Sequence, residues 1–252
     1  MKIGRGGIAT IVIVAIVLTV VVIVVAAVFA VILLKTTPPA IITEAWIKSY
    51  TGTSDDGFFG VAVDSQNNVI VTGLSWNASG TGGDDYLTIK YDSNGNVQWM
   101  KSYTVKWDDR AFGVAVDSQN NVIVTGAARN AVTGNDDYLT IKYDSNGNVQ
   151  WMKSYSGAGN DEAFGVAVDS RNNVIVTGHS YNAGTDDDYL TIKYDSNGNV
   201  QWMRSYTGTS NDWAFGVAVD SQNNVIVTGV SYNAAGTGNH DSSTIKYVET
   251  SE

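Results

Sequence analysis

An internal repeat restricts the fold of this chain more than any other feature of its sequence. Copies of about the same length begin at four tryptophans, spaced 53, 52 and 51 residues apart: Trp46, Trp99, Trp151 and Trp202. Each copy contains short runs with the apolar alternation of β-strands, such as "FGVAV" at 59–63 and "NVIVTG" at 68–73. A period near 50 residues that is built only from strands is typical of β-propeller blades.

The number of strands in each copy indicates how the ring closes. Every copy has a third run, as in "YLTIKYD" at 86–92, but "YDSNGNVQWM", which leads into a fourth run, occurs only three times. The last copy stops after its third run, while "AWIKSY" at 45–50 matches the end of a fourth. We therefore predict an all-β fold, a four-bladed β-propeller closed by an N-terminal strand, because sharing a blade leaves no unpaired edge.

The repeats resemble the SBBP-type β-propeller repeat family. They share with it a "GVAVDS" strand, an "NNVIVTG" strand and a K-Y-D-x-x-G turn that leads to a tryptophan. The resemblance covers residues 46–247 and implies a propeller over residues 46–252.

An apolar run precedes the propeller. Residues 8–34 carry no charge, and as a helix they exceed the ~30 Å core of a bilayer. We predict one long apolar α-helix over 8–35, in a membrane or in a filament core, followed by a linker at 36–45. Basic residues before the run favour an N-terminus inside and a propeller outside the cell. A cleaved secretory signal is the alternative, although its apolar core is usually shorter.

The start of the chain, "MKIGRGGIATIVIV", resembles type IV pilin precursors, in which a short basic leader ends in glycine before the apolar helix. The resemblance implies a leader over residues 1–7 that is cut at Gly6 or Gly7. It also implies a homo-oligomer that assembles through residues 8–34 after a stage in the membrane. Glycine at the first mature position, and no glutamate at the fifth, depart from the usual pattern.

One side of the predicted ring varies between copies. It carries the loops from second to third strands and from fourth to first strands, which we call the variable face. Aromatic residues there form a candidate partner face for a carbohydrate or a protein: Trp76, Trp107, Trp213, Tyr181 and Tyr232. Packing over neighbouring blades is the competing interpretation. Asn77 begins the Asn-Ala-Ser glycosylation sequon in one such loop.

Composition excludes several functions. A net charge of −10 argues against a nucleic-acid partner, and the absence of cysteine excludes thiolate metal sites. We predict no metal site and no cofactor, because the repeated loop aspartates lack the ligand spacing of a calcium loop. The two histidines, His179 and His240, fall in different copies without readable partners, so we predict no catalytic residues and no enzymatic activity.

Two functions remain. The first is a structural, pilin-like filament subunit at the cell surface with a propeller head. The second is a membrane-anchored propeller that binds a carbohydrate or protein through its variable face.

Overall fold

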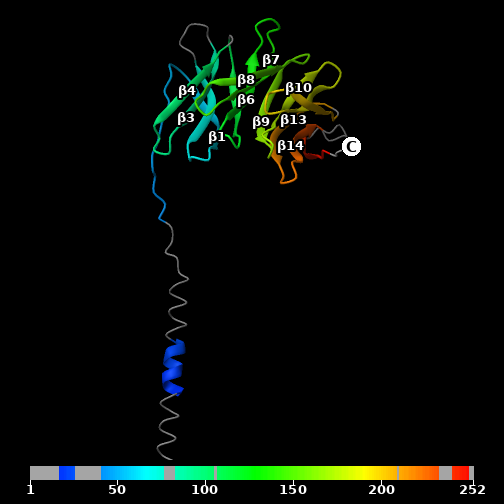
Figure 1. Cartoon of the computed structure of the whole chain (residues 1–252). Coiled ribbons are helices and arrows are strands. Elements are labelled where there is room, and N and C mark those ends of the chain that lie inside the picture. Colours follow the sequence, from blue (N-terminus) through cyan, green and yellow to red (C-terminus); the bar gives the residue numbers. More distant parts are fainter. Residues whose placement is uncertain are drawn as a thin grey trace, which may run out of the picture. The chain divides into compact units, whose positions relative to one another are not determined.

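Figure 1 shows the computed structural model of the chain, which describes residues 17–25, 41–76, 83–104, 107–208, 210–232 and 240–249. The chain divides into two compact units, Met1–Ala45 and Trp46–Glu252. Residues 17–25 are helical. The remainder of the predicted 8–35 helix lies outside the described residues, as do Gly6 and Gly7. Among the described residues, no helix has the length and apolar character needed to span a bilayer.

The second unit is built from antiparallel sheets that follow one another along the chain, as the repeat predicts. The first sheet contains β1 (Asp56–Val63), β2 (Val69–Trp76), β3 (Asp84–Tyr91) and β4 (Val97–Tyr103), and the second contains β5 (Arg110–Val116), β6 (Val122–Arg129), β7 (Asp136–Tyr143) and β8 (Val149–Tyr155). The third sheet contains β9 (Asp161–Val168), β10 (Val174–Asn182), β11 (Asp186–Tyr194) and β12 (Val200–Tyr206). The fourth sheet contains β13 (Asp212–Val219), β14 (Val225–Tyr232) and β15 (His240–Tyr247). Each sheet has its strands in sequence order. The all-β, propeller-like fold is therefore confirmed.

Small residues let the first strands of neighbouring sheets approach closely. A Cβ on Gly60 would lie 3.0 Å from the backbone oxygen of Phe112, and one on Gly113 would lie 2.9 Å from that of Phe164. Contacts of this length are shorter than nearly all Cβ contacts in proteins, so glycine is favoured where the sheets crowd together.

The core lies between sheets rather than within a single sheet. Ile70 and Tyr86 of the first sheet pack with Val122 and Leu139 of the second. Two polar elements are buried beside this core: the Thr72–Thr88 hydroxyl pair (3.1 Å) and the Lys90–Asp64 ion pair (2.8 Å). Each of these four buried polar side chains has a partner, as burial requires.

Ring closure by the N-terminal strand is not found. Residues 41–55 form no strand, and among the described residues nothing pairs with the free edge of β15. Trp46 contacts the first sheet as Trp99 contacts the second: its Nε1 donates to the carbonyl of Ser93 (3.2 Å), and its ring lies 5.9 Å from that of Tyr91. The physical reason is that the first and fourth sheets lie at opposite ends of the row of sheets (Figure 1), so the segment that starts at Trp46 stays with the first sheet and does not reach the edge of β15.

Candidate functional site

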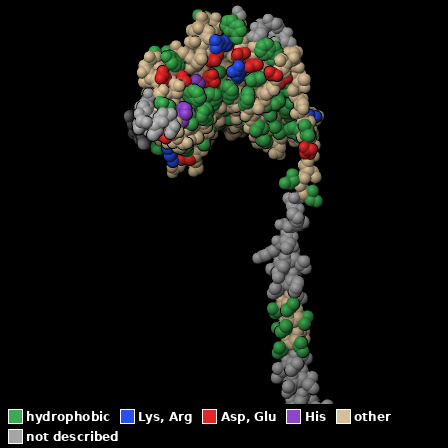
Figure 2. Space-filling model, turned by 180° about the vertical axis from the view of Figure 1, so that it is seen from behind, with side chains coloured by type: hydrophobic (Ala, Val, Ile, Leu, Met, Phe, Trp, Pro, Cys, Tyr) green, Lys and Arg blue, Asp and Glu red, His purple; other side chains and the backbone are tan. Residues whose placement is uncertain are grey.

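A pocket of about 520 Å³ opens on the variable face at the third and fourth sheets. Its lining combines aromatic rings, carboxylates, amides and one imidazole: Asn135, Gly159, Asn160, Glu162, Phe164, His179, Tyr181, Asp187 and Trp213. The loop before β7 supplies Asn135, the loop before β9 supplies Gly159 and Asn160, and strands β9, β10, β11 and β13 supply the remainder. Acidic and hydrophobic side chains are interspersed over the surface of the sheets (Figure 2).

Tilted rings form one wall of the pocket. The buried His179 imidazole contacts both Phe164 and Trp213, with centroid distances of 5.7 and 5.6 Å. Trp213 and Tyr181 are 37% and 38% exposed, so each presents part of its ring to the opening. Aromatic rings with one accessible face and a polar edge are well suited to contact a ligand that is itself amphipathic.

Asp187 links two of these rings. Its Oδ2 accepts a hydrogen bond from Trp213 Nε1 (2.8 Å), and its Oδ1 lies 3.5 Å from His179 Nδ1. That nitrogen is buried and has no hydrogen-bond partner among the described residues. An unsatisfied buried polar atom is rare in proteins, so His179 has hydrogen-bonding capacity available at the pocket wall.

Burial shifts the ionisation of two groups in the pocket. It lowers the pKa of His179, although the carboxylate of Asp187 opposes the shift. Burial also raises the pKa of Glu162, reinforced by the charge of Asp136 and opposed by Arg110. The imidazole is therefore predominantly neutral at pH 7.

At two pocket positions that differ in all four copies, only the third copy carries an imidazole and a carboxylate. His179 occupies the place of Leu74, Ala127 and Val230, and Glu162 the place of Gly57, Arg110 and Trp213. Gly159 is also needed, because a Cβ there would lie 2.5 Å from the Tyr181 ring. These departures were the signal in the sequence that could have located the site.

The structure gathers only part of the predicted partner face. Tyr181 and Trp213 share the pocket, whereas Trp76 lies at the first sheet beside Tyr50 in a separate, smaller pocket. Tyr232 packs against His240 with centroids 5.7 Å apart, and Trp107 is 44% exposed. Asn77 lies outside the described residues.

The expectation that His179 has no partner is wrong. The residue contacts the rings of Phe164 and Trp213 and faces Asp187. Phe164 and Asp187 come from the same sheet as His179, whereas Trp213 comes from the next copy of the repeat. Glu162, Phe164 and Asp187 were also missed as pocket residues. Among the described residues, no group of three or more acidic, histidine or cysteine side chains is placed to hold a metal ion.

Comparisons with known proteins give a fold likeness only. No family model matches the chain, and no curated protein matches it. A structure of a protein of unknown function from Bacteroides caccae is 10% identical, with a TM-score of 0.45 over 75% of this chain and 60% of that chain. A gluconolactonase from Xanthomonas campestris is 12% identical, with a TM-score of 0.43 over 73% of this chain and 58% of that chain.

An exo-1,5-alpha-L-arabinanase from a bovine ruminal metagenomic library is 10% identical, with a TM-score of 0.37 over 74% of this chain and 72% of that chain. The chain thus spans about three fifths of the first two proteins. At these identities and TM-scores the likeness carries no argument about activity. The absence of enzymatic activity therefore stays a prediction.

Proposed function

We propose that this chain is a binding protein that holds a neutral carbohydrate in the pocket on its variable face. The observation that carries the proposal is the lining itself, in which the half-exposed rings of Trp213 and Tyr181 stand beside the carboxylates of Glu162 and Asp187. Sugars present an apolar C–H face to such rings and hydroxyl donors to such acceptors. Hydrogen bonds from hydroxyl groups to carboxylates are charge-assisted and therefore strong.

Charge and size favour the same class of ligand. Among the described residues, the lining contains two carboxylates and no lysine or arginine, which disfavours phosphate, sulfate and other anionic ligands. A volume of about 520 Å³ falls within the range of small-molecule sites and suits one or two sugar rings.

A filament subunit and a cell-surface location stay predictions. Both rest mainly on the leader and the apolar run, and most of these residues lie outside the described ones. The binding function is compatible with an anchored, external propeller, and it draws its support from side chains that the structure does describe.

Isothermal titration calorimetry on the purified full-length chain, with neutral mono- and disaccharides selected on a glycan array, tests the proposal. We expect Trp213→Ala to weaken binding about 10- to 100-fold, because it removes a ring and its bond to Asp187. Trp76→Ala is the matched control, a tryptophan of similar exposure outside the pocket, and it leaves binding unchanged. No saccharide binding at all, or equal losses in both variants, would contradict the proposal.

Two further measurements sharpen the test. Because Glu162 has a raised pKa, its carboxylate is lost at a higher pH than usual, so affinity falls as the solution is acidified through that pKa. Glu162→Gln removes this acid dependence. Chemical conversion of the bound saccharide, abolished in Glu162→Gln, would replace the binding function with an enzymatic one.

A further inference from the structure

Neighbouring sheets in the row join through an interface that repeats from one pair of sheets to the next. At the two ends of the row, the first sheet exposes one half of this interface and the fourth sheet exposes the other half. Val61 and Val63 on the first sheet are 68% and 57% exposed. The corresponding Val114 and Val116 of the second sheet pack against the core. The difference arises because the second sheet has another sheet on that side, whereas among the described residues the first sheet has no neighbouring sheet there and is contacted only by the segment that holds Trp46 and Tyr50.

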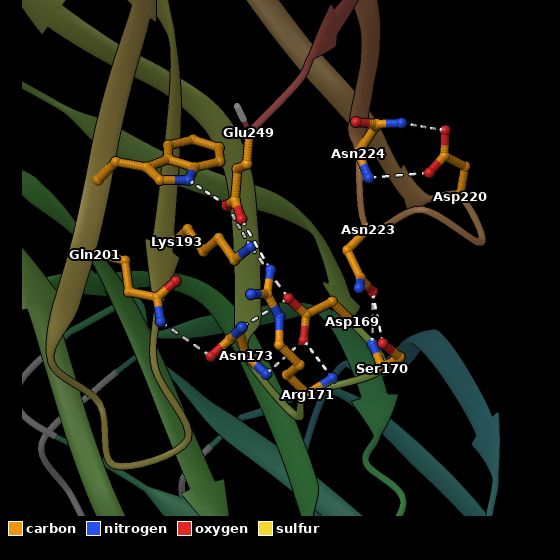
Figure 3. A network of polar contacts seen from close by, with 11 residues as sticks. Asp169, Ser170, Arg171, Asn173, Lys193, Gln201, Asp220, Asn223, Asn224 and Glu249 are labelled. Carbon is orange, nitrogen blue, oxygen red and sulfur yellow. Dashed lines mark hydrogen bonds and ion pairs between the residues drawn. The ribbon is translucent and has the colours of Figure 1, made fainter. Parts of the chain in front are cut away.

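A serine–asparagine contact recurs at each internal interface. The backbone N–H of Ser65 donates to Asn120 Oδ1 on the next sheet (3.0 Å), and that of Ser118 donates to Asn172 Oδ1 (3.1 Å). Ser170 and Asn223 repeat the contact between the third and fourth sheets (3.0 Å; Figure 3).

A lysine and a tryptophan also share one acceptor at each internal interface. Lys90 Nζ and Trp99 Nε1 both donate to the carbonyl of Ser145, at 3.3 and 3.1 Å. Lys142 and Trp151 both donate to the carbonyl of Ser196, at 3.4 and 3.1 Å. At the third interface, Lys193 and Trp202 donate to the carboxylate of Glu249, which also binds Arg171 (Figure 3).

The ends of the row hold the same groups, separated from their counterparts. At the first sheet, Ser93 accepts from Trp46 but from no lysine among the described residues, and the side chain of Asn67 has no described donor. At the fourth sheet, Lys246 pairs with Asp220 and reaches no neighbouring sheet, and the N–H of Ser221 has no described acceptor. Asn67 has the same left-handed backbone as its counterparts (φ 62°), so its side chain is preset for the contact.

We propose that a second copy of this chain docks head to tail, with its first sheet seated on the fourth sheet. Ser221 of one copy then donates to Asn67 of the other, and Lys246 donates to the carbonyl of Ser93. In the second copy Trp46 already contacts the first sheet. Residues 46–50 of that copy then lie along β15 and supply the fourth strand that the fourth sheet lacks. Such a heterologous contact closes into a ring or continues as a row of copies, depending on its angle.

Ser242 marks one difference between this contact and the internal ones. The corresponding Tyr86 and Tyr138 each donate to a carbonyl on the next sheet, at 3.0 Å, and a serine is too short to do so. The interface between the third and fourth sheets also lacks this bond, since the Tyr189 hydroxyl has no described partner, and it forms nonetheless. The missing bond is therefore compatible with docking.

A second copy fits these surfaces better than the far end of the same chain. The first and fourth sheets lie at opposite ends of the row, with two sheets between them (Figure 1). Joining them within one chain would require the sheets to move relative to one another at interfaces whose hydrogen bonds are already made.

Cysteine cross-linking tests the contact in the full-length chain, purified in detergent because of its apolar N-terminal run. The chain has no cysteine, so Asn67→Cys and Ser221→Cys introduce the only thiols. We expect a mixture of the two single variants to give a covalent species of twice the chain mass on oxidation, and neither variant alone to do so to the same extent. Ser118→Cys with Asn172→Cys, whose side chains lie 2.9 Å apart in one chain, is the positive control.

Other outcomes would overturn the proposal. If the variant carrying both Asn67→Cys and Ser221→Cys oxidises to a monomer with an internal disulfide, the chain closes on itself. If only the positive control cross-links, the ends do not meet at all. Val61→Arg provides a second check, because a charge in this apolar contact lowers the cross-linked yield about tenfold or more, whereas Val97→Arg, on the outer strand β4, does not. This test is independent of carbohydrate binding.

Discussion

The second and fourth sheets contain the same lysine–aspartate pair in two different environments. Lys142 and Asp117 lie 2.8 Å apart with side chains 2% and 0% exposed. Lys246 and Asp220 lie at the same distance, 2.8 Å, with side chains 51% and 28% exposed. The sequence around each pair is nearly identical, so the geometry of the pair is a local property and its burial depends on whether another sheet follows.

The surroundings change the energetics of the pair without changing its ionisation. Burial by itself would raise the pKa of Asp117, but hydrogen bonds from Lys142 and Asn121 outweigh it and hold the pKa below its usual value. Bonds from Lys246 and Asn224 likewise lower the pKa of Asp220. Both aspartates are therefore charged at neutral pH. Removing one partner would leave an uncompensated charge in the protein interior only in the buried Lys142–Asp117 pair.

Lys142→Met should produce the largest effect. Because it leaves the Asp117 carboxylate buried without its cation, we expect the free energy of unfolding to fall by about 3–5 kcal/mol. Urea denaturation followed by tryptophan fluorescence measures the change. A loss below about 1 kcal/mol, the size typical of exposed pairs, would mean that water reaches this interface.

Thr125→Val should have an intermediate effect. The hydroxyl of Thr125 is fully buried and lies 3.0 Å from that of Thr140, so the substitution leaves a buried hydroxyl with fewer partners. We expect a loss of about 1–3 kcal/mol in the same denaturation experiment. Thr228→Val is the matched control, since its pair with Thr244 is exposed in a single copy, and in dilute solution it should change stability by less than about 0.5 kcal/mol. Equal losses would show that the fourth sheet is covered in solution.

Lys246→Met should have the smallest effect in dilute solution, where the chain is a single copy and the pair with Asp220 is exposed. An exposed ion pair contributes about 0–1 kcal/mol, and salt screens it, so the variant and the wild type should converge in 1 M NaCl. A loss as large as that of Lys142→Met, growing with protein concentration, would indicate that a second copy buries this pair. The same experiment therefore connects the comparison of the two sheets with the proposed docking.

Local patterns predicted most of the secondary structure. Alternation in "NVIVTG" and "TIKY" and the Asn-Gly turns place strands where the structure has them, because side-chain period and turn geometry are properties of a few adjacent residues. Variation between copies predicted Tyr181 and Trp213 as members of a partner face. The local patterns missed His179 and Glu162, whose role depends on Trp213 more than 30 residues away in the sequence.

The order of the sheets, their strands and the small residues between them follow from the sequence alone, since each copy carries its own pattern and neighbours in the chain become neighbours in space. The arrangement of the ends does not follow from it. "AWIKSY" matches the end of the fourth strand in every copy of the repeat that has one. No local pattern therefore predicts which sheet edge this segment pairs with. Only the tertiary structure decided that Trp46 packs on the first sheet and that the edge of β15 stays open, because the angle between sheets, set by side-chain packing at every interface, decides whether the ends meet.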